Sequence, residues 1–203
     1  CIREHMEQYK IEPYDEANHR GLVRHVLIRK GFRTGELMVC LVLNGEVKAL
    51  TEADVLVERL RGLFGDGTAV TSISVSINRE KTNVIMGSRI VNLFGPGYIT
   101  DYIGNVKYRI SPLSFYQVNP VQTEYLYGKA IELAGLTGKE LVLDAYCGIG
   151  TIGMIASKQA NTVIGVELNA DAVKDAIQNA KMNGIRNIRF FCNDATKFMM
   201  QMA

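Results

Sequence analysis

The sequence predicts an α/β protein with two parts: a front part of mixed α+β type built on an antiparallel sheet, and a back part built on a parallel sheet. Two observations support this prediction. In residues 1–110, short apolar runs follow one another with brief turns between them, which favours strands that pair with their sequence neighbours. In residues 111–203, strand-like and helix-like segments alternate, which favours parallel strands joined by helices. The boundary between the two parts is expected near residue 111.

One segment of the front part alternates strictly in polarity. Within residues 71–77, isoleucine or valine at 73, 75 and 77 alternates with serine at 72, 74 and 76, so the apolar side chains are expected to face a core and the serines to face solvent. A helix is expected to begin after Thr51, because a threonine side chain can accept a hydrogen bond from the first turn. Further strands are predicted at 22–29, 37–43, 83–87, 90–94, 98–103 and 106–110.

The back part is predicted to open with a helix. Asn119 is expected to cap it, with Pro120 in its first position and Gly135 at its end. Its apolar stripe is expected at Leu126, Ala130, Leu133 and Ala134. Strands at 141–144, 162–166 and 188–192 then alternate with helices at 151–159 and 170–183. This order is typical of a doubly wound parallel sheet.

Composition narrows the function classes. The chain has 203 residues, a net charge of +2 and no apolar run long enough to predict a membrane span. Its four cysteines form no CxxC pair and fit no zinc-ligand spacing, so free thiols in a reducing cytoplasm are expected and no metal site is predicted. Cys40 and Cys192 fall within predicted strands and are expected in the core.

A cluster of positive charge lies in the front part. Residues 19–33 contain five Arg and Lys side chains and no acid. Such a cluster could contact the phosphates of a nucleic acid, and it could equally be the solvated face of a strand and its turn. The candidate RNA contacts are Arg24, Arg29 and Arg33.

The most informative stretch is a glycine loop between a predicted strand and a predicted helix. Gly148 and Gly150 can adopt positive φ and allow a ligand close to the backbone. Taken literally, residues 148–153 match G-x-G-x-x-G, and Glu167 follows about 20 residues later, as in dinucleotide-binding sites. However, three residues separate Asp144 at the strand end from the first glycine. This looser turn suits a ligand with an ammonium group and no pyrophosphate, such as the methionine end of S-adenosylmethionine.

Three acids end successive predicted strands of the back part, at Asp144, Glu167 and Asp194. Because parallel strands end at one edge of the sheet, these carboxylates are expected along one edge. Glu167 can accept hydrogen bonds from both hydroxyls of a ribose, and Asp194 can accept one from an adenine amino group. Thr151 is either a helix cap or a ligand contact. Cys147, inside the loop, is expected to be a small packing residue and not a nucleophile.

Several motifs resemble the RNA 5-methyluridine methyltransferases. They are residues 114–120 (SFYQVNP), 144–151 (DAYCGIGT), 165–167 (GVE) and 179–184 (NAKMNG). In the front part, residues 14–16 (YDE), 19–26 (HRGLVRHV) and 31–34 (GFRT) resemble the central domain of the branch that methylates ribosomal RNA in Gram-positive bacteria. The resemblance implies a central RNA-facing domain over 1–110. It also implies the N-terminal half of a Rossmann-like, S-adenosylmethionine-dependent methyltransferase domain over 111–203.

The resemblance also implies roles for individual residues. Gln117 corresponds to a glutamine that contacts the methionine part of the cofactor, and Tyr146 to an aromatic residue that lies against it. Thr151 stands where many members have asparagine. The expected cofactor-binding residues are Gln117, Tyr146, Gly148, Thr151, Glu167 and Asp194.

The implied reaction is methyl transfer to carbon 5 of uridine in ribosomal RNA. In the family, a cysteine that follows an Asp-Pro-Pro-Arg strand adds to carbon 6 of the base. That motif does not occur in these 203 residues, so no catalytic residue is assigned and the chain is expected to be an inactive fragment of an enzyme. Its third parallel strand would offer an unpaired edge for dimerisation. Two alternatives remain open: an NAD-dependent oxidoreductase, and a non-enzymatic RNA-binding module.

Overall fold

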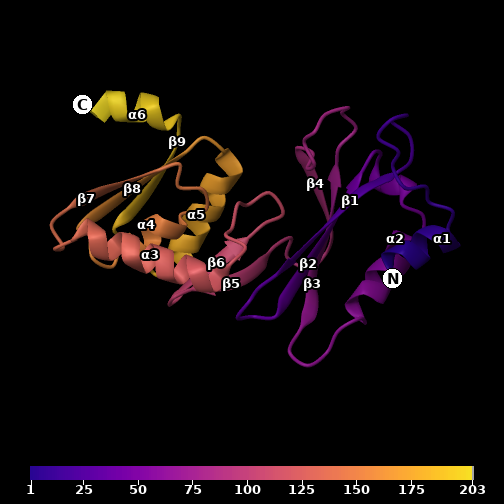
Figure 1. Cartoon of the computed structure of the whole chain (residues 1–203), viewed down its shortest axis with the longest axis horizontal. Coiled ribbons are helices and arrows are strands. Elements are labelled where there is room, and N and C mark those ends of the chain that lie inside the picture. The colour runs from indigo at the N-terminus through magenta and orange to yellow at the C-terminus, as the bar shows by residue number, and fades with distance from the viewer. Residues whose placement is uncertain (203) are drawn as a thin grey trace. The chain divides into compact units, whose positions relative to one another are not determined.

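The computed structural model describes residues 1–202, and the chain divides into two compact units, Cys1–Ile99 and the part from Thr100 onward (Figure 1). The division precedes the boundary expected at residue 111. The physical reason is the strand pair β5 (Ile99–Ile103) and β6 (Val106–Ile110), because β6 bonds to helices of the second unit. No helix among residues 1–202 has the length and apolarity needed to cross a membrane.

The first unit is a four-stranded sheet in the order β1-β2-β3-β4. Its strands are β1 (Val23–Lys30), β2 (Glu36–Leu43), β3 (Ala69–Ile77) and β4 (Arg89–Phe94). The pairs β1–β2 and β3–β4 are antiparallel, as expected for sequence neighbours. The central pair β2–β3 is parallel, so the expectation of an antiparallel sheet was wrong for this pair. A helix forms the connection between these two strands and returns the chain to the same end of the sheet.

Helices cover one face of this sheet and complete its core. They are α1 (Ile2–Gln8), the short 3-10 turn η1 (Val47–Ala49) and α2 (Ala53–Arg61), and Figure 1 shows α1 and α2 on the same side of the strands. Leu56 and Leu60 of α2 pack in one buried cluster with Leu41 of β2 and Ile73 of β3. The apolar periodicity of both the helix and the strands therefore serves a single core.

The serines of β3 are buried, and the prediction that they face solvent was wrong. Ser72, Ser74 and Ser76 have no exposed surface, so β3 is covered on both faces. In β3, the alternating residues therefore place large apolar side chains on one face and small polar side chains on the other, and both faces are buried. Ser76 is satisfied locally, since its Oγ accepts a hydrogen bond from the Gly87 N–H at 2.9 Å.

Two other expectations for the first unit were also wrong. The segment 83–87 is a loop between β3 and β4, in which the Asn78 side-chain amide donates to the carbonyls of Val84 (2.6 Å) and Ile85 (3.1 Å). The cap of α2 is Glu52, in left-handed conformation with φ of 52°, and not Thr51. The Thr51 carbonyl instead lies 2.9 Å from Nε2 of buried His5.

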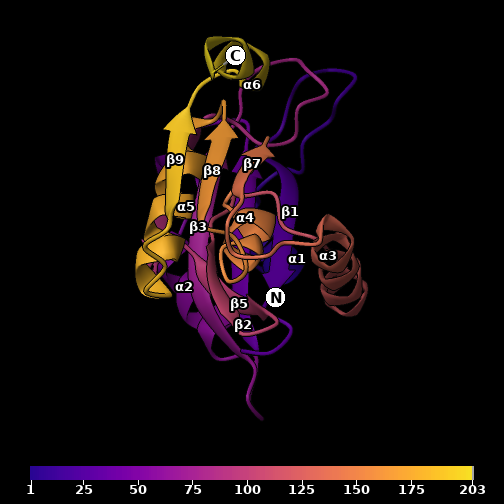
Figure 2. The same cartoon turned by 90° about the vertical axis from the view of Figure 1, so that its left-hand side faces the viewer.

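The second unit contains a parallel sheet in the order β7-β8-β9, which confirms the expected strand–helix alternation. The strands are β7 (Leu141–Ala145), β8 (Thr162–Glu167) and β9 (Ile188–Cys192), and the helices are α3 (Pro120–Ala134), α4 (Thr151–Ala156), α5 (Ala170–Met182) and α6 (Ala195–Met202). Figure 2 shows the three strands ending at the same edge. All four cysteines are free, and Cys192 is exposed where a core position was expected, because β9 is an edge strand.

Helix α3 begins and ends as expected but buries a different face. The Asn119 side chain accepts a hydrogen bond from the Gln122 N–H at 3.1 Å, and Gly135 ends the helix in left-handed conformation. The buried side chains are Thr123, Tyr127 and Ile131. The expected stripe was wrong, since Leu126 and Leu133 are exposed. The polar tips of Thr123 and Tyr127 find hydrogen-bond partners, so these residues can replace leucine inside.

The cap of α5 allows a stability prediction. The Asn169 Oδ1 accepts hydrogen bonds from the backbone N–H groups of Asp171 and Ala172. Asn169→Ala is therefore expected to lower the free energy of unfolding by about 1 kcal/mol, and Asn169→Asp to retain most of it. Urea unfolding followed by circular dichroism measures the change. Gln178→Ala, at an exposed position of the same helix, is the control and should be nearly neutral. Equal effects of Asn169→Ala and Gln178→Ala would contradict the cap.

Candidate functional site

The glycine loop between β7 and α4 is tightly wound. Tyr146, Gly148 and Gly150 have φ of 63°, 55° and 83°, so the backbone enters the left-handed region three times in five residues. The loop is closed by a hydrogen bond from the Gly150 N–H to the Cys147 carbonyl at 2.8 Å. A Cβ at Gly150 would come within 2.9 Å of the Phe190 ring, whereas one at Gly148 would meet nothing within 4 Å. Gly150 is thus needed for packing, and Gly148 leaves the backbone open to approach.

Asp144, at the end of β7, holds the start of α4. Its Oδ2 accepts a hydrogen bond from the Gly153 N–H at 2.8 Å. A Cβ at position 153 would lie 2.8 Å from the same oxygen, which explains the third glycine of the motif. Burial raises the pKa of Asp144 to about 6, against the opposing effect of this hydrogen bond. The three-residue spacing between acid and glycine therefore lets the strand-end carboxylate bind the helix backbone.

Glu167, at the end of β8, is fixed between the glycine loop and the start of α5. Its Oε2 accepts from the Gly148 N–H at 3.1 Å, and its Oε1 accepts from the Asn169 N–H at 2.8 Å. Each carboxylate oxygen has a second lone pair, so both can accept a further hydrogen bond from a ligand diol. Two backbone N–H groups therefore orient the side chain that is predicted to bind a ribose.

Cys147 lies buried between these two acids. Burial and the charges of Asp144 and Glu167 raise the pKa of its thiol to about 12. A nucleophilic cysteine acts as the thiolate, which is scarce at neutral pH when the pKa is this high. The environment supports the interpretation of Cys147 as a packing residue.

The other predicted cofactor residues lie around the loop or at neighbouring element ends. Tyr146 is 71% exposed beside the glycines. Thr151 begins α4 and is half-buried. Asp194 follows β9 and accepts from the Lys197 N–H at 2.9 Å, so its hydrogen bond runs to α6. Gln117 is half-buried in the segment that leads into α3. Of the predicted cofactor residues, Glu167 and Gly148 are joined to each other by a hydrogen bond. Asp194 and Gln117 lie on other segments of the second unit.

Two tyrosines that sequence reasoning missed hold the start of α4. The Tyr108 hydroxyl donates to the Thr151 carbonyl at 3.0 Å, and the Tyr127 hydroxyl lies 3.3 Å from Thr151 Oγ1. Burial raises the pKa of Tyr108 well above its usual range. These contacts span 43 and 24 residues, so no local pattern signals them.

The three candidate RNA contacts lie in different environments. The Arg24 guanidinium donates to the carbonyls of Asn78 (3.0 Å) and Glu80 (2.8 Å), and it lies 4.4 Å from the centre of the Tyr14 ring. Arg24 therefore stabilises the start of the loop between β3 and β4. Arg29 is half-buried, and burial lowers its pKa. Arg33 is exposed at the turn between β1 and β2. Their contact with RNA stays a prediction.

Comparison with known proteins finds that the chain is similar to methyltransferases. Residues 136–203 match the family described as "Methyltransferase domain". The chain is 46% identical over 198 residues to a Halalkalibacterium halodurans protein named an uncharacterized RNA methyltransferase, covering 98% of this chain and 42% of the relative. A protein of the same name from Caldanaerobacter subterraneus subsp. tengcongensis is 42% identical over 198 residues, covering 97% of this chain and 42% of the relative.

Among the solved structures that resemble nearly the whole chain is one of a methyltransferase bound to a cofactor product. It is the crystal structure of Pyrococcus abyssi tRNA (uracil-54, C5)-methyltransferase in complex with S-adenosyl-L-homocysteine, with a TM-score of 0.77 and 29% identity. The likeness covers 94% of this chain and 44% of that one. The second unit thus has the Rossmann-like fold of S-adenosylmethionine-dependent methyltransferases. The chain spans about two fifths of the curated relatives it matches. The oxidoreductase and non-enzymatic alternatives gain no support from these matches.

The buried Asp144 predicts a pH dependence of stability. Its pKa of about 6 lies above the ordinary value of 3.8, so the folded state holds this proton more tightly than the unfolded state. Stability is therefore expected to fall by about 2 kcal/mol as pH rises from about 4 to about 6. Asp144→Asn should flatten this part of the profile, measured by urea unfolding at a series of pH values. Asp54→Asn, at an exposed position, is the control. An unaltered profile in Asp144→Asn would refute this role.

Proposed function

We propose that the chain is part of an S-adenosylmethionine-dependent methyltransferase that modifies carbon 5 of uridine in ribosomal RNA. The observation that carries the proposal is the Glu167 carboxylate, held at the end of β8 by the N–H groups of Gly148 and Asn169. A carboxylate oriented in this way beside an open glycine backbone suits a ribose diol. The second unit supplies this site, and the first unit is proposed to face RNA.

The cofactor, S-adenosylmethionine, is indicated by the methyltransferase-domain match and by the Pyrococcus abyssi neighbour, whose structure holds S-adenosyl-L-homocysteine. When bound, its sulfonium supplies the methyl group. The residues present suit it: Glu167 would accept the ribose hydroxyls, and Asp194 would accept the adenine amino group. Gln117 and Tyr146 would contact the methionine part, with Thr151 at the start of α4. The φ of 55° at Gly148 and the open space around it let the backbone lie close to the ligand.

Two similarities support the RNA substrate. The curated relatives are named RNA methyltransferases, and the Pyrococcus abyssi neighbour is named for carbon 5 of uracil-54 in tRNA. The proposed ribosomal target rests on the resemblance of residues 19–26 and 31–34 to the branch that methylates ribosomal RNA, and the cytoplasm is the proposed place of action. The proposal assigns no catalytic group to this chain, since the raised pKa of Cys147 does not suit a nucleophile.

Cofactor binding is tested by calorimetric titration with S-adenosyl-L-homocysteine. Saturable binding is expected for the unaltered chain, and Glu167→Ala should weaken it by roughly 10- to 100-fold, because hydrogen bonds to a charged carboxylate are lost. Glu132→Ala, which removes an exposed carboxylate on α3, is the control and should bind as the unaltered chain does. A folded chain that binds NAD and not S-adenosyl-L-homocysteine would contradict the proposal.

The target base is tested by transplanting the chain. A chimera of the Halalkalibacterium halodurans relative, with this sequence in place of its matching region of 198 residues, is incubated with unmodified ribosomal RNA and S-adenosylmethionine. Mass spectrometry of the nucleosides is expected to find 5-methyluridine, with the unaltered relative as the control. A different methylated nucleoside from both proteins would rule out uridine carbon 5.

A further inference from the structure

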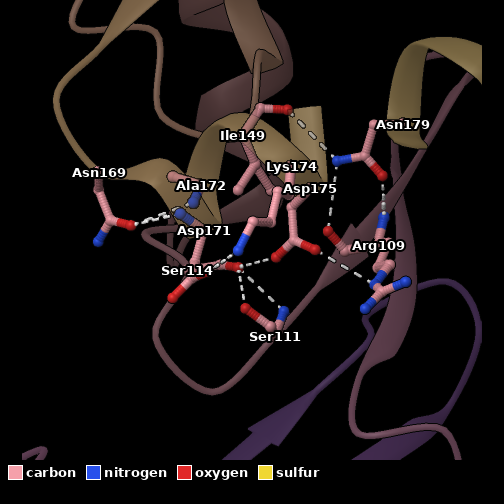
Figure 3. A network of polar contacts seen from close by, with 10 residues as sticks. All are labelled: Arg109, Ser111, Ser114, Ile149, Asn169, Asp171, Ala172, Lys174, Asp175 and Asn179. Carbon is pink, nitrogen blue, oxygen red and sulfur yellow. Dashed lines mark hydrogen bonds and ion pairs between the residues drawn. The ribbon is translucent and has the colours of Figure 1, made fainter. Parts of the chain in front are cut away.

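Asn179 joins three segments of the second unit through one side-chain amide. It lies on α5 and has no exposed surface. Its Oδ1 accepts a hydrogen bond from the Arg109 N–H at 2.7 Å, and its Nδ2 donates to the carbonyls of Arg109 and Ile149, each at 3.3 Å (Figure 3). The helix, strand β6 and the glycine loop therefore meet at a single buried group.

Asn183, one helical turn later, makes the same pair of contacts with β6. Its Oδ1 accepts from the Lys107 N–H at 2.9 Å, and its Nδ2 donates to the Lys107 carbonyl at 2.6 Å. The two amides thus pair with alternate residues of β6, much as a neighbouring strand would. The Asn183 amide also donates to the Asn179 carbonyl at 2.8 Å, a contact between the C-cap residue of α5 and the helix itself. The glycine-loop contact is what distinguishes Asn179.

The carbonyl that Asn179 binds lies between two glycines of the loop. Ile149 lies between Gly148 and Gly150, both with positive φ, and peptide groups beside glycine rotate more freely than others. A hydrogen bond at this carbonyl fixes the peptide plane shared with Gly150, whose N–H closes the loop onto Cys147 at 2.8 Å. It also restrains Gly148, whose N–H meets Glu167.

The preceding turn of α5 anchors the approach to α3 in a similar way. Asp175 is buried, and its Oδ2 accepts from the Ser114 hydroxyl at 3.2 Å, while its Oδ1 lies 3.2 Å from Arg109 Nε (Figure 3). The Ser114 hydroxyl also accepts from the Ser111 N–H at 3.0 Å. Residues 175, 179 and 183 follow at intervals of four, so one face of α5 holds the strand, the loop and the segment toward Gln117.

We propose that Asn179 is a positioning residue for the cofactor: by holding the Ile149 carbonyl, it keeps the glycine loop in the shape that receives S-adenosylmethionine. This inference rests on the proposed function, because it takes the loop to be the cofactor site. Asn183 forms hydrogen bonds with the same strand, whereas the hydrogen bond to the Ile149 carbonyl comes from Asn179. Asn183 therefore provides a matched control.

The test compares S-adenosyl-L-homocysteine affinity with stability in Asn179→Ala and Asn183→Ala. Both substitutions leave backbone groups of β6 without side-chain partners, so both are expected to lower Tm. Only Asn179→Ala is expected to weaken binding, by about tenfold, while Asn183→Ala stays within about twofold. Asn179→Asp is the second variant: it keeps an acceptor for the Arg109 N–H, lacks the donor to Ile149, and should also weaken binding.

Amide hydrogen exchange supplies a readout that does not involve the ligand. The Gly150 N–H is expected to exchange faster in Asn179→Ala or Asn179→Asp than in Asn183→Ala. Binding by the unaltered chain, with equal affinities in Asn179→Ala and Asn183→Ala, would overturn this inference alone. An unaltered chain that is folded and fails to bind would overturn the proposed function, and this inference with it.

Discussion

The second unit depends on carboxylates at the ends of parallel strands holding a loop of glycine backbone. Asp144 accepts a hydrogen bond from the Gly153 N–H, and Glu167 accepts one from the Gly148 N–H. The side chain at each strand end therefore binds the backbone of the glycine loop or of the helix that follows it. The loop needs this support because its left-handed residues are conformationally costly for any side chain and entropically costly for glycine. The acids therefore stabilise the turn that a ligand would approach. The same two side chains thus contribute to the stability of the fold and to the candidate site.

Around this turn, hydrogen bonds from buried polar side chains fix the backbone. Tyr108 and Tyr127 hold Thr151 at the start of α4, and Asn179 holds the carbonyl of Ile149. Each of these contacts satisfies a group that burial would otherwise leave costly. Directional bonds also define one loop conformation, which apolar contacts would do less strictly.

Sequence reasoning located most elements because their signals are local. The strands and helices of the second unit, the Asn119 cap and the Gly135 end all follow from neighbouring residues. It failed where burial depends on distant partners. The serines of β3 and the threonine and tyrosine face of α3 are buried although polar, and Cys192 is exposed on an edge strand. The pattern of polar residues in a sequence indicates which side chains share a face of a helix or strand. It does not indicate whether another part of the protein covers that face.

The candidate site divides in the same way. Strand-end acids and loop glycines were predictable from spacing, whereas the groups that support them come from β6, α3 and α5. The most direct test of the account is an amide NMR titration of the chain with S-adenosyl-L-homocysteine. We expect the largest shifts at the N–H groups of Gly148 and Gly150 and at those beside Glu167. Shifts confined to other segments, or absent at saturating ligand, would contradict the assignment of this loop as the cofactor site.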